Sequence, residues 1–362
     1  MSFKTKIIFT ADDFGVENSI NEGIIDLVQK GIINSVEVLP NFGPKGEKSV
    51  YNTLKLIDAA ANIPHLELGI HFTITSGNAL TNHSDLKPIL ETGSNINEFV
   101  SFQTLNSKAS YEAVKGELLA QANVLLGNPK IAPFITHISN HHDALWFYPP
   151  YTRALIDIAN QLNLPVRNPR SYPASRTWVY YALQNKIKLA KKSKDRSQIE
   201  GAYELRKLGF FPNQSLSYCT TDYMDNRFYG VMDNFFAADP RDVHAALRAK
   251  RRKIKNMFDK AAAAGPYGKR AEIIEFMFHL RKGKVMDAEL AGKATHVAGY
   301  KGIDLAYFDG RTIEYLALHK YKDFILEQLN SEYLTTGSWS DCKDFILFAK
   351  NNTNSMSKSS VV

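Results

Sequence analysis

Two adjacent carboxylates, Asp12 and Asp13, stand where a short hydrophobic run over residues 7–9 gives way to Gly15. A hydrophobic run bounded by glycine is typical of a buried strand. Polar residues at the C-terminal edge of such a strand carry the chemistry of many α/β proteins. Neighbouring carboxylates repel each other and favour a cation or a shared proton. We therefore expect a bound cation or a shared proton at the end of this strand.

Two later hydrophobic runs lead to histidines. The run over residues 66–70 ends on His71, and the run that starts at Phe134 contains His137 and leads to His141. One carboxylate and two imidazoles from three strand ends make the ligand set of an open divalent-metal site, with positions left for water and substrate. On residue types alone, surface histidines and a solvated aspartate pair remain the alternative.

The segments around these residues alternate between two periodicities. Helical spacing of hydrophobic residues predicts helices at 19–28, 54–61, 111–126 and 151–162, and short hydrophobic runs predict strands at 33–39, 66–71 and from 134 onwards. This alternation indicates an α/β fold with a parallel sheet or barrel. The polar segment 73–93 is expected to form a long loop over the strand ends, at the rim of a substrate site.

The later part of the chain departs from this rhythm. Residues 171–269 hold basic helical segments and an aromatic-rich stretch, so we expect an insertion or an elaborated layer there. A strand over 272–279 ends on His279, and a late helix is expected over 315–329. We therefore predict a single domain over 1–349 that includes this insertion, followed by a polar, disordered tail over 350–362.

The composition argues against several classes of protein. The 362 residues include only two cysteines, Cys219 and Cys342, so neither a disulfide framework nor a thiolate metal site is indicated. No hydrophobic run is long enough to span a bilayer and none resembles a leader, which predicts a soluble, cytoplasmic protein.

The formal charge of +7 is concentrated in segments 186–194 and 248–255. We interpret these segments as the solvated faces of amphipathic helices and expect neither a membrane nor a nucleic-acid partner. Binding of RNA or of a membrane surface through the basic helices is the alternative. A homodimer is compatible with the sequence.

Four motifs carry a resemblance to a known family. They are A-D-D-F-G at 11–15, G-x-H at 69–71, a histidine-rich segment at 136–145 and E-x-M-x-H at 275–279. With these motifs the chain resembles the YdjC-like carbohydrate deacetylases, the family of the chitooligosaccharide deacetylases, over most of its length. The resemblance implies a distorted (β/α) barrel and a hydrolase that removes an acetyl group from an N-acetylated sugar or oligosaccharide.

The resemblance also implies roles for five residues. Asp13, His71 and His141 would bind a divalent metal ion, Asp12 would be the general base, and His279 would assist the departing amine. Zinc is the first expectation because two ligands are nitrogen, and Mg²⁺, Mn²⁺ or Co²⁺ would also be admitted.

The third motif departs from the family pattern at several positions. Ser139 stands where the family usually has aspartate, and Asp143 and Leu145 stand where it usually has histidine. Loss of a carboxylate beside a metal ligand weakens metal affinity or alters the substrate that fits. A carbohydrate-binding protein without turnover is therefore the second interpretation. We expect His137 to pack beneath the site and His142 to point away from it.

Overall fold

The computed structural model describes residues 4–92, 97–101, 105, 108–146, 149–167, 222–225, 243–264, 273–283 and 305–340. Its strands are β1 (Thr5–Phe14), β2 (Ser35–Val38), β3 (Glu67–Phe72), β4 (Ile135–Asn140), β5 (Asp222–Asp225), β6 (Ile273–His279) and β7 (Leu334–Thr336). Within this part of the chain they form one sheet in the order β4-β3-β2-β1-β6-β5, and β7 also pairs with β1. Every pairing is parallel, which confirms the predicted α/β class.

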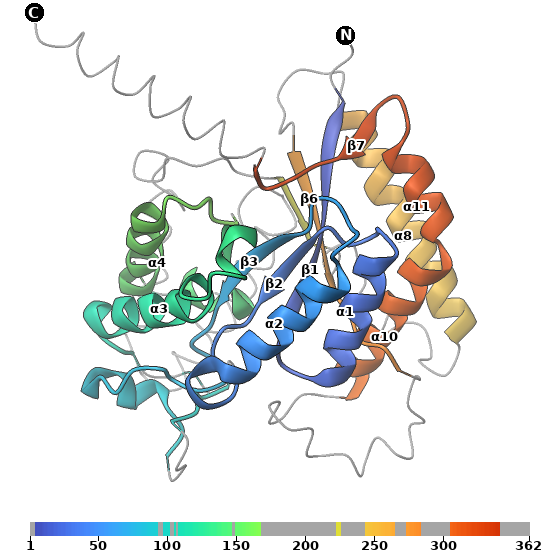
Figure 1. Cartoon of the computed structure of the whole chain (residues 1–362). Coiled ribbons are helices and arrows are strands. Elements are labelled where there is room, and N and C mark those ends of the chain that lie inside the picture. Colours follow the sequence, from blue (N-terminus) through green and yellow to red (C-terminus); the bar gives the residue numbers. More distant parts are fainter. Residues whose placement is uncertain are drawn as a thin grey trace, which may run out of the picture.

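Helices surround this sheet (Figure 1). They are α1 (Asn18–Gln29), α2 (Glu47–Ala59), α3 (Tyr111–Leu126), α4 (Pro149–Leu162), α8 (Val243–Ala264), α10 (Leu305–Lys320) and α11 (Lys322–Leu329). Short 3-10 helices lie at Pro44–Gly46, Ser84–Ile89, Ala132–Phe134 and His141–Trp146. Helix α3 has the predicted bounds, since Ser110 caps its first turn by accepting the Ala113 N–H.

Two helices differ from the sequence prediction for physical reasons. Helix α2 begins at Glu47, well before residue 54. The hydrophobic pattern missed its first turns because the buried face there carries the polar Ser49 and Asn52. The late helix is two helices, α10 and α11, separated at Tyr321. The spacing of hydrophobic residues does not reveal a break of one residue between two helices.

The sheet curls strongly. Val166 pairs with Ile138 at the β4 edge, so Arg167 is five strand positions from β6. Neighbouring strands lie about 4.8 Å apart, which would separate these positions by roughly 24 Å in a flat sheet. Arg167 nevertheless donates to Glu275 of β6 at 2.6 Å. The β4 edge of the sheet therefore approaches β6 across a polar interior, and closure into a complete barrel remains a prediction.

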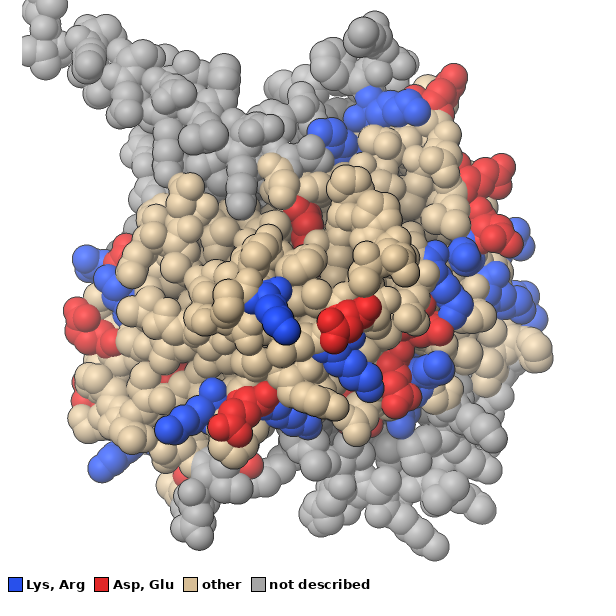
Figure 2. All heavy atoms as spheres, viewed as in Figure 1, with Lys and Arg blue, Asp and Glu red and all other residues tan. Residues whose placement is uncertain are grey.

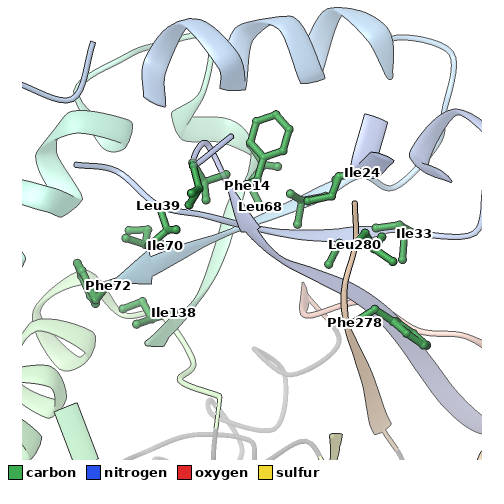
Figure 3. Packing of buried hydrophobic residues seen from close by; sticks show 14 of the residues in the cluster. Phe14, Ile24, Ile33, Leu39, Leu68, Ile70, Phe72, Ile138, Phe278 and Leu280 are labelled. Atoms are coloured by element: carbon green, nitrogen blue, oxygen red, sulfur yellow. The ribbon is translucent and has the colours of Figure 1, made fainter. Parts of the chain in front are cut away.

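Hydrophobic side chains fill the space between the sheet and its helices. Figure 3 shows this packing for residues of β1, β3, β4 and β6 and the segments between them. Phe9 of β1 lies at the centre of an aromatic group, 5.9 Å from Phe258 of α8 and 5.5 Å from Phe278 of β6 between ring centroids. Burying each such side chain contributes about 1.5–3 kcal/mol, so this core fixes the strand ends that carry the polar residues.

Most of the predicted insertion at 171–269, and all of the predicted tail at 350–362, lie outside the described residues. Within 171–269, strand β5 joins the sheet beside β6, and α8 packs against the sheet through Phe258. Strand β5 is thus part of the central sheet, and α8 is one of the helices that cover it. The extent of the domain and of the insertion stays a prediction.

The basic segment at 248–255 is only partly solvated. Lys250 and Lys253 are buried, and Lys250 donates to Glu314 at 2.5 Å, so the expectation of a fully solvated basic face is wrong for these two residues. On the face in Figure 2, lysine and arginine are mixed with aspartate and glutamate. No helix in the described part of the chain is long and hydrophobic enough to cross a membrane.

Candidate metal centre

A backbone irregularity turns both aspartates toward the same end of the sheet. The pairing of β1 with β2 shifts register between Ala11 and Phe14, and Asp13 has φ 69°. Successive side chains of a regular strand point to opposite faces, whereas a bulge re-aims them and aspartate tolerates the left-handed conformation better than most residues. The bulge therefore lets neighbouring carboxylates serve one site.

Three side chains meet at this bulge with the geometry of a metal centre. Asp13 from β1, His71 from β3 and His141 just after β4 offer ligand atoms that all lie within 4.8 Å of one another, and all three residues are buried. Asp13 Oδ1 is 3.3 Å from His71 Nε2 and 2.8 Å from His141 Nδ1. The structure thus brings together the three residues that the sequence proposed as ligands.

One nitrogen of each imidazole faces Asp13, and the hydrogen bond of the other nitrogen determines whether the facing nitrogen is left as an acceptor. His71 Nδ1 lies 2.6 Å from Ser139 Oγ, and the Ser139 hydroxyl donates to Glu37. The Ser139 oxygen is therefore left to accept, and a neutral His71 carries its proton on Nδ1. Its Nε2 lone pair then faces Asp13.

His141 is arranged in the same way. Its Nε2 lies 3.1 Å from Ser76 Oγ, and the Ser76 hydroxyl donates to the Thr75 carbonyl at 2.8 Å. A neutral His141 thus presents the lone pair of Nδ1 to Asp13, whose Oδ1 has no hydrogen-bond donor in the described part of the chain. Three buried acceptors converge on one point, an arrangement that fits a divalent cation.

The charges of the surrounding network favour a cation as well. Among the described residues, the linked carboxylates are Asp12, Asp13, Glu37 and Glu275, and the guanidiniums bonded to them are Arg167 and Arg311. All six are buried. With all four carboxylates ionised, negative charges in this set exceed positive ones by two, which is the charge of one divalent ion.

The pKa values of the ligand residues follow from their neighbours. Burial alone would raise the pKa of Asp13, but His141 and Arg311 outweigh it and hold that pKa well below its ordinary value. Burial likewise opposes a charged His71, yet Asp13 and Asp12 raise the pKa of His71 above its ordinary value. Burial lowers the pKa of His141. Without a cation, the site therefore favours a proton on His71.

Asp12 is held rigidly beside this cluster. Arg167 donates to both of its oxygens, at 2.8 Å from Nη1 and 2.9 Å from Nη2. Burial raises the pKa of Asp12 despite the opposing charge of Arg167. A buried carboxylate with a raised pKa and a fixed orientation is suited to accepting a proton near neutral pH.

His279 lies at the same level of the sheet as Asp12. It is the register partner of Asp12 in the β1–β6 pairing, and its Nε2 lies 3.8 Å from Asp13 Oδ2. Its backbone N–H donates to Glu314 of α10 at 2.8 Å. The structure thus places all five residues proposed from the sequence around one point.

The sequence interpretation missed three buried partners of these residues. Glu37 lies within β2 between two valines, Arg167 follows the short strand at Val166, and Arg311 of α10 donates to Asp13 at 2.5 Å. An isolated charge inside a hydrophobic strand, as at Glu37, was the available signal. Arg311 offered no signal, because its helix comes from a distant part of the chain.

The other histidines of the motif region lie beside the cluster. His137 bonds to Glu37 Oε1 at 2.7 Å and stacks on Trp339, with 4.3 Å between ring centroids, as expected for a residue that packs beneath the site. His142 was expected to point away, and this is wrong. The backbone there is a 3-10 helix with φ 57° at His142, so its ring packs 3.7 Å from that of His141.

Two departures from the family pattern can be located. Ser139 contacts His71 directly, whereas Leu145 is fully buried in the hydrophobic core. The side chain of Asp143, the other departure at a histidine position, lies outside the described residues.

Comparison with known proteins extends these findings. The chain is 33% identical over 166 residues to a carbohydrate deacetylase of Vibrio campbellii, a match that covers 45% of this chain and 58% of that protein. It is 31% identical over 163 residues to carbohydrate deacetylase 2 of Listeria innocua, covering 45% of this chain and 60% of that one. The chain therefore matches less than two thirds of the length of these curated relatives.

A solved structure has the same fold. It is the crystal structure of a protein of Enterococcus faecalis named for cellobiose-phosphate cleavage, with a TM-score of 0.56, 16% identity and coverage of 93% of this chain and 98% of that one. The sequence profile of the YdjC-like proteins matches residues 6–290, which include the Asp12–Asp13 pair, both imidazoles of the cluster and His279. The chain belongs to the YdjC-like protein family.

Proposed function

We propose that the protein is a divalent-metal-dependent hydrolase that removes the acetyl group from an N-acetylated sugar or oligosaccharide. One observation carries this proposal. Asp13, His71 and His141 turn three buried acceptors toward one point beside a rigidly held Asp12. The names of the curated relatives supply the substrate class.

Asp13, His71 and His141 would hold the metal ion, which when bound lowers the pKa of water and polarises the acetamide carbonyl. Asp12 accepts the proton of the attacking water while Arg167 keeps its carboxylate in place. A bond forms from the water oxygen to the carbonyl carbon, the C–N bond breaks, and His279 donates a proton to the departing amine. The products are acetate and a free amino sugar.

The competing interpretation is a family member that binds sugar without turnover, suggested by Ser139 and the two replaced histidines. The buried network argues against lost function, since Ser139 joins His71 to Glu37 and no ligand residue has been replaced. Zinc is the first metal proposed, with Mg²⁺, Mn²⁺ and Co²⁺ as alternatives.

Acetate release tests the proposal. The protein would be stripped of metal, reconstituted with each of the four ions, and incubated with N-acetylated mono- and oligosaccharides. We expect metal-dependent acetate release from at least one of them. Metal binding without acetate release from any substrate would favour the sugar-binding interpretation, and absence of metal binding would overturn the proposed centre. A cytoplasmic location and a homodimer remain predictions from the sequence.

A further inference from the structure

A chain of hydrogen bonds runs from His71 away from the candidate metal centre. His71 Nδ1 lies 2.6 Å from Ser139 Oγ, and Ser139 donates to Glu37. A carboxylate accepts hydrogen bonds and does not donate them when ionised, so the Ser139 proton is directed at Glu37. The Ser139 oxygen then accepts from His71, and the chain has one direction, from imidazole to carboxylate.

Glu37 is fixed at the far end of this chain. His137 Nε2 lies 2.7 Å from its Oε1, and Arg167 Nη2 donates to the same oxygen at 3.1 Å. Burial alone would raise the pKa of Glu37, but His137 and Arg167 outweigh burial and lower that pKa far below its ordinary value. Its other oxygen is left to accept from Ser139.

A glycine makes room for this connection. Glu37 of β2 pairs in register with Gly69 of β3, and His71 of β3 with Ser139 of β4. A Cβ at position 69 would lie 2.2 Å from Glu37 Oε2 and 2.5 Å from His137 Nε2. The absence of a side chain at Gly69 thus lets the Glu37 carboxylate cross β3 and reach the β4 serine.

We propose that Glu37, acting through Ser139, is a positioning residue that holds His71 with Nε2 directed at the metal ion. The aspartate that the family resemblance leads one to expect at 139 is then replaced by a serine, and its charge is supplied from β2. Carboxylate partners of imidazole ligands fix the tautomer and the ring orientation, and their loss costs about 10- to 100-fold in metal affinity.

This inference rests on the metal centre of the proposed function, so its test measures metal affinity in the absence of substrate. Zn²⁺ affinity would be determined by competition with a chromophoric chelator for the wild type, Ser139→Ala and the double variant Glu37→Gln/Ser139→Asp. We expect Ser139→Ala to bind about 10- to 100-fold more weakly. The double variant returns the carboxylate to position 139 and should recover most of the affinity, whereas Ser139→Asp alone places two buried carboxylates together and should not.

Ser35→Ala is the matched control. Ser35 is an equally buried serine whose hydroxyl lies 3.3 Å from His137 Nε2, and in the described part of the chain it makes no hydrogen bond to His71. This variant should bind Zn²⁺ like the wild type. NMR of the imidazole nitrogens in the metal-free protein, at a pH above the raised pKa of His71, gives a second readout. Neutral His71 should be protonated on Nδ1 and should lose this preference in Ser139→Ala.

The outcomes separate the inference from the function. Equal Zn²⁺ affinity of the wild type and Ser139→Ala, or the same His71 tautomer in both, would overturn the role of Glu37 and Ser139 while leaving the deacetylase proposal intact. Failure of every sugar substrate, with weakened Zn²⁺ binding in Ser139→Ala, would remove the proposed reaction and retain the inference.

Discussion

Asparagine substitution should separate the roles of the two adjacent aspartates. Asp12→Asn keeps the volume of the side chain and removes the proton acceptor, so turnover should fall by about 10²- to 10⁴-fold, the usual contribution of a general base. Arg167 retains its hydrogen bonds to Glu275 and Glu37, so the buried guanidinium keeps partners. The cost in stability should then stay near 1–3 kcal/mol, and the metal should still bind.

Asp13→Asn should have the opposite effect. A neutral amide is a weaker ligand and brings no charge, so metal affinity should fall steeply and activity should return only in part at high metal concentration. The assay is a pair of measurements on each variant, a metal titration and the rate of acetate release under saturating metal. Loss of metal in Asp12→Asn with retention in Asp13→Asn would reverse the two roles. Equal loss in both would make the pair a shared ligand set.

Two further predictions concern the cluster and one concerns the hydrophobic core. Because the pKa of His71 is raised above its ordinary value of 6.5, a proton competes with the metal below the raised pKa. Metal affinity should therefore rise as pH increases above 6.5, and a pH-independent affinity there would contradict this. Gly69→Ala should displace Glu37 and weaken Zn²⁺ binding at least as much as Ser139→Ala, whereas Gly116→Ala, with open space around the added methyl, should bind normally. Phe258→Ala should lower the free energy of unfolding by about 3–5 kcal/mol, measured by denaturant titration, because α8 packs this ring against Phe9 and Phe276.

Much of the fold could be predicted because its signals are local. Each strand that carries a candidate ligand is a short hydrophobic run ending on a polar residue, and parallel pairing brings such ends to one edge of the sheet. The five site residues were proposed for this reason and through the motif resemblance, and their roles stay a prediction.

The buried polar network could not be predicted because it depends on the curl of the sheet. Arg167 reaches Asp12 and Glu275 only because the β4 edge approaches β6, and no sequence pattern encodes this distance. Both aspartates face the site because of the bulge at Asp13. The regular alternation of side chains along a strand does not predict such a bulge. Polar buried faces, as in α2, removed the periodicity that marks a helix.

Anomalous diffraction from crystals of the zinc-loaded protein tests the central claim most directly. Data collected on both sides of the zinc absorption edge would locate the ion without reference to activity or to the choice of substrate. We predict one peak per chain in contact with Asp13, His71 and His141, at about 2.0–2.2 Å from each ligand atom. A zinc peak elsewhere, or none at this cluster with zinc bound in solution, would contradict the metal centre proposed here.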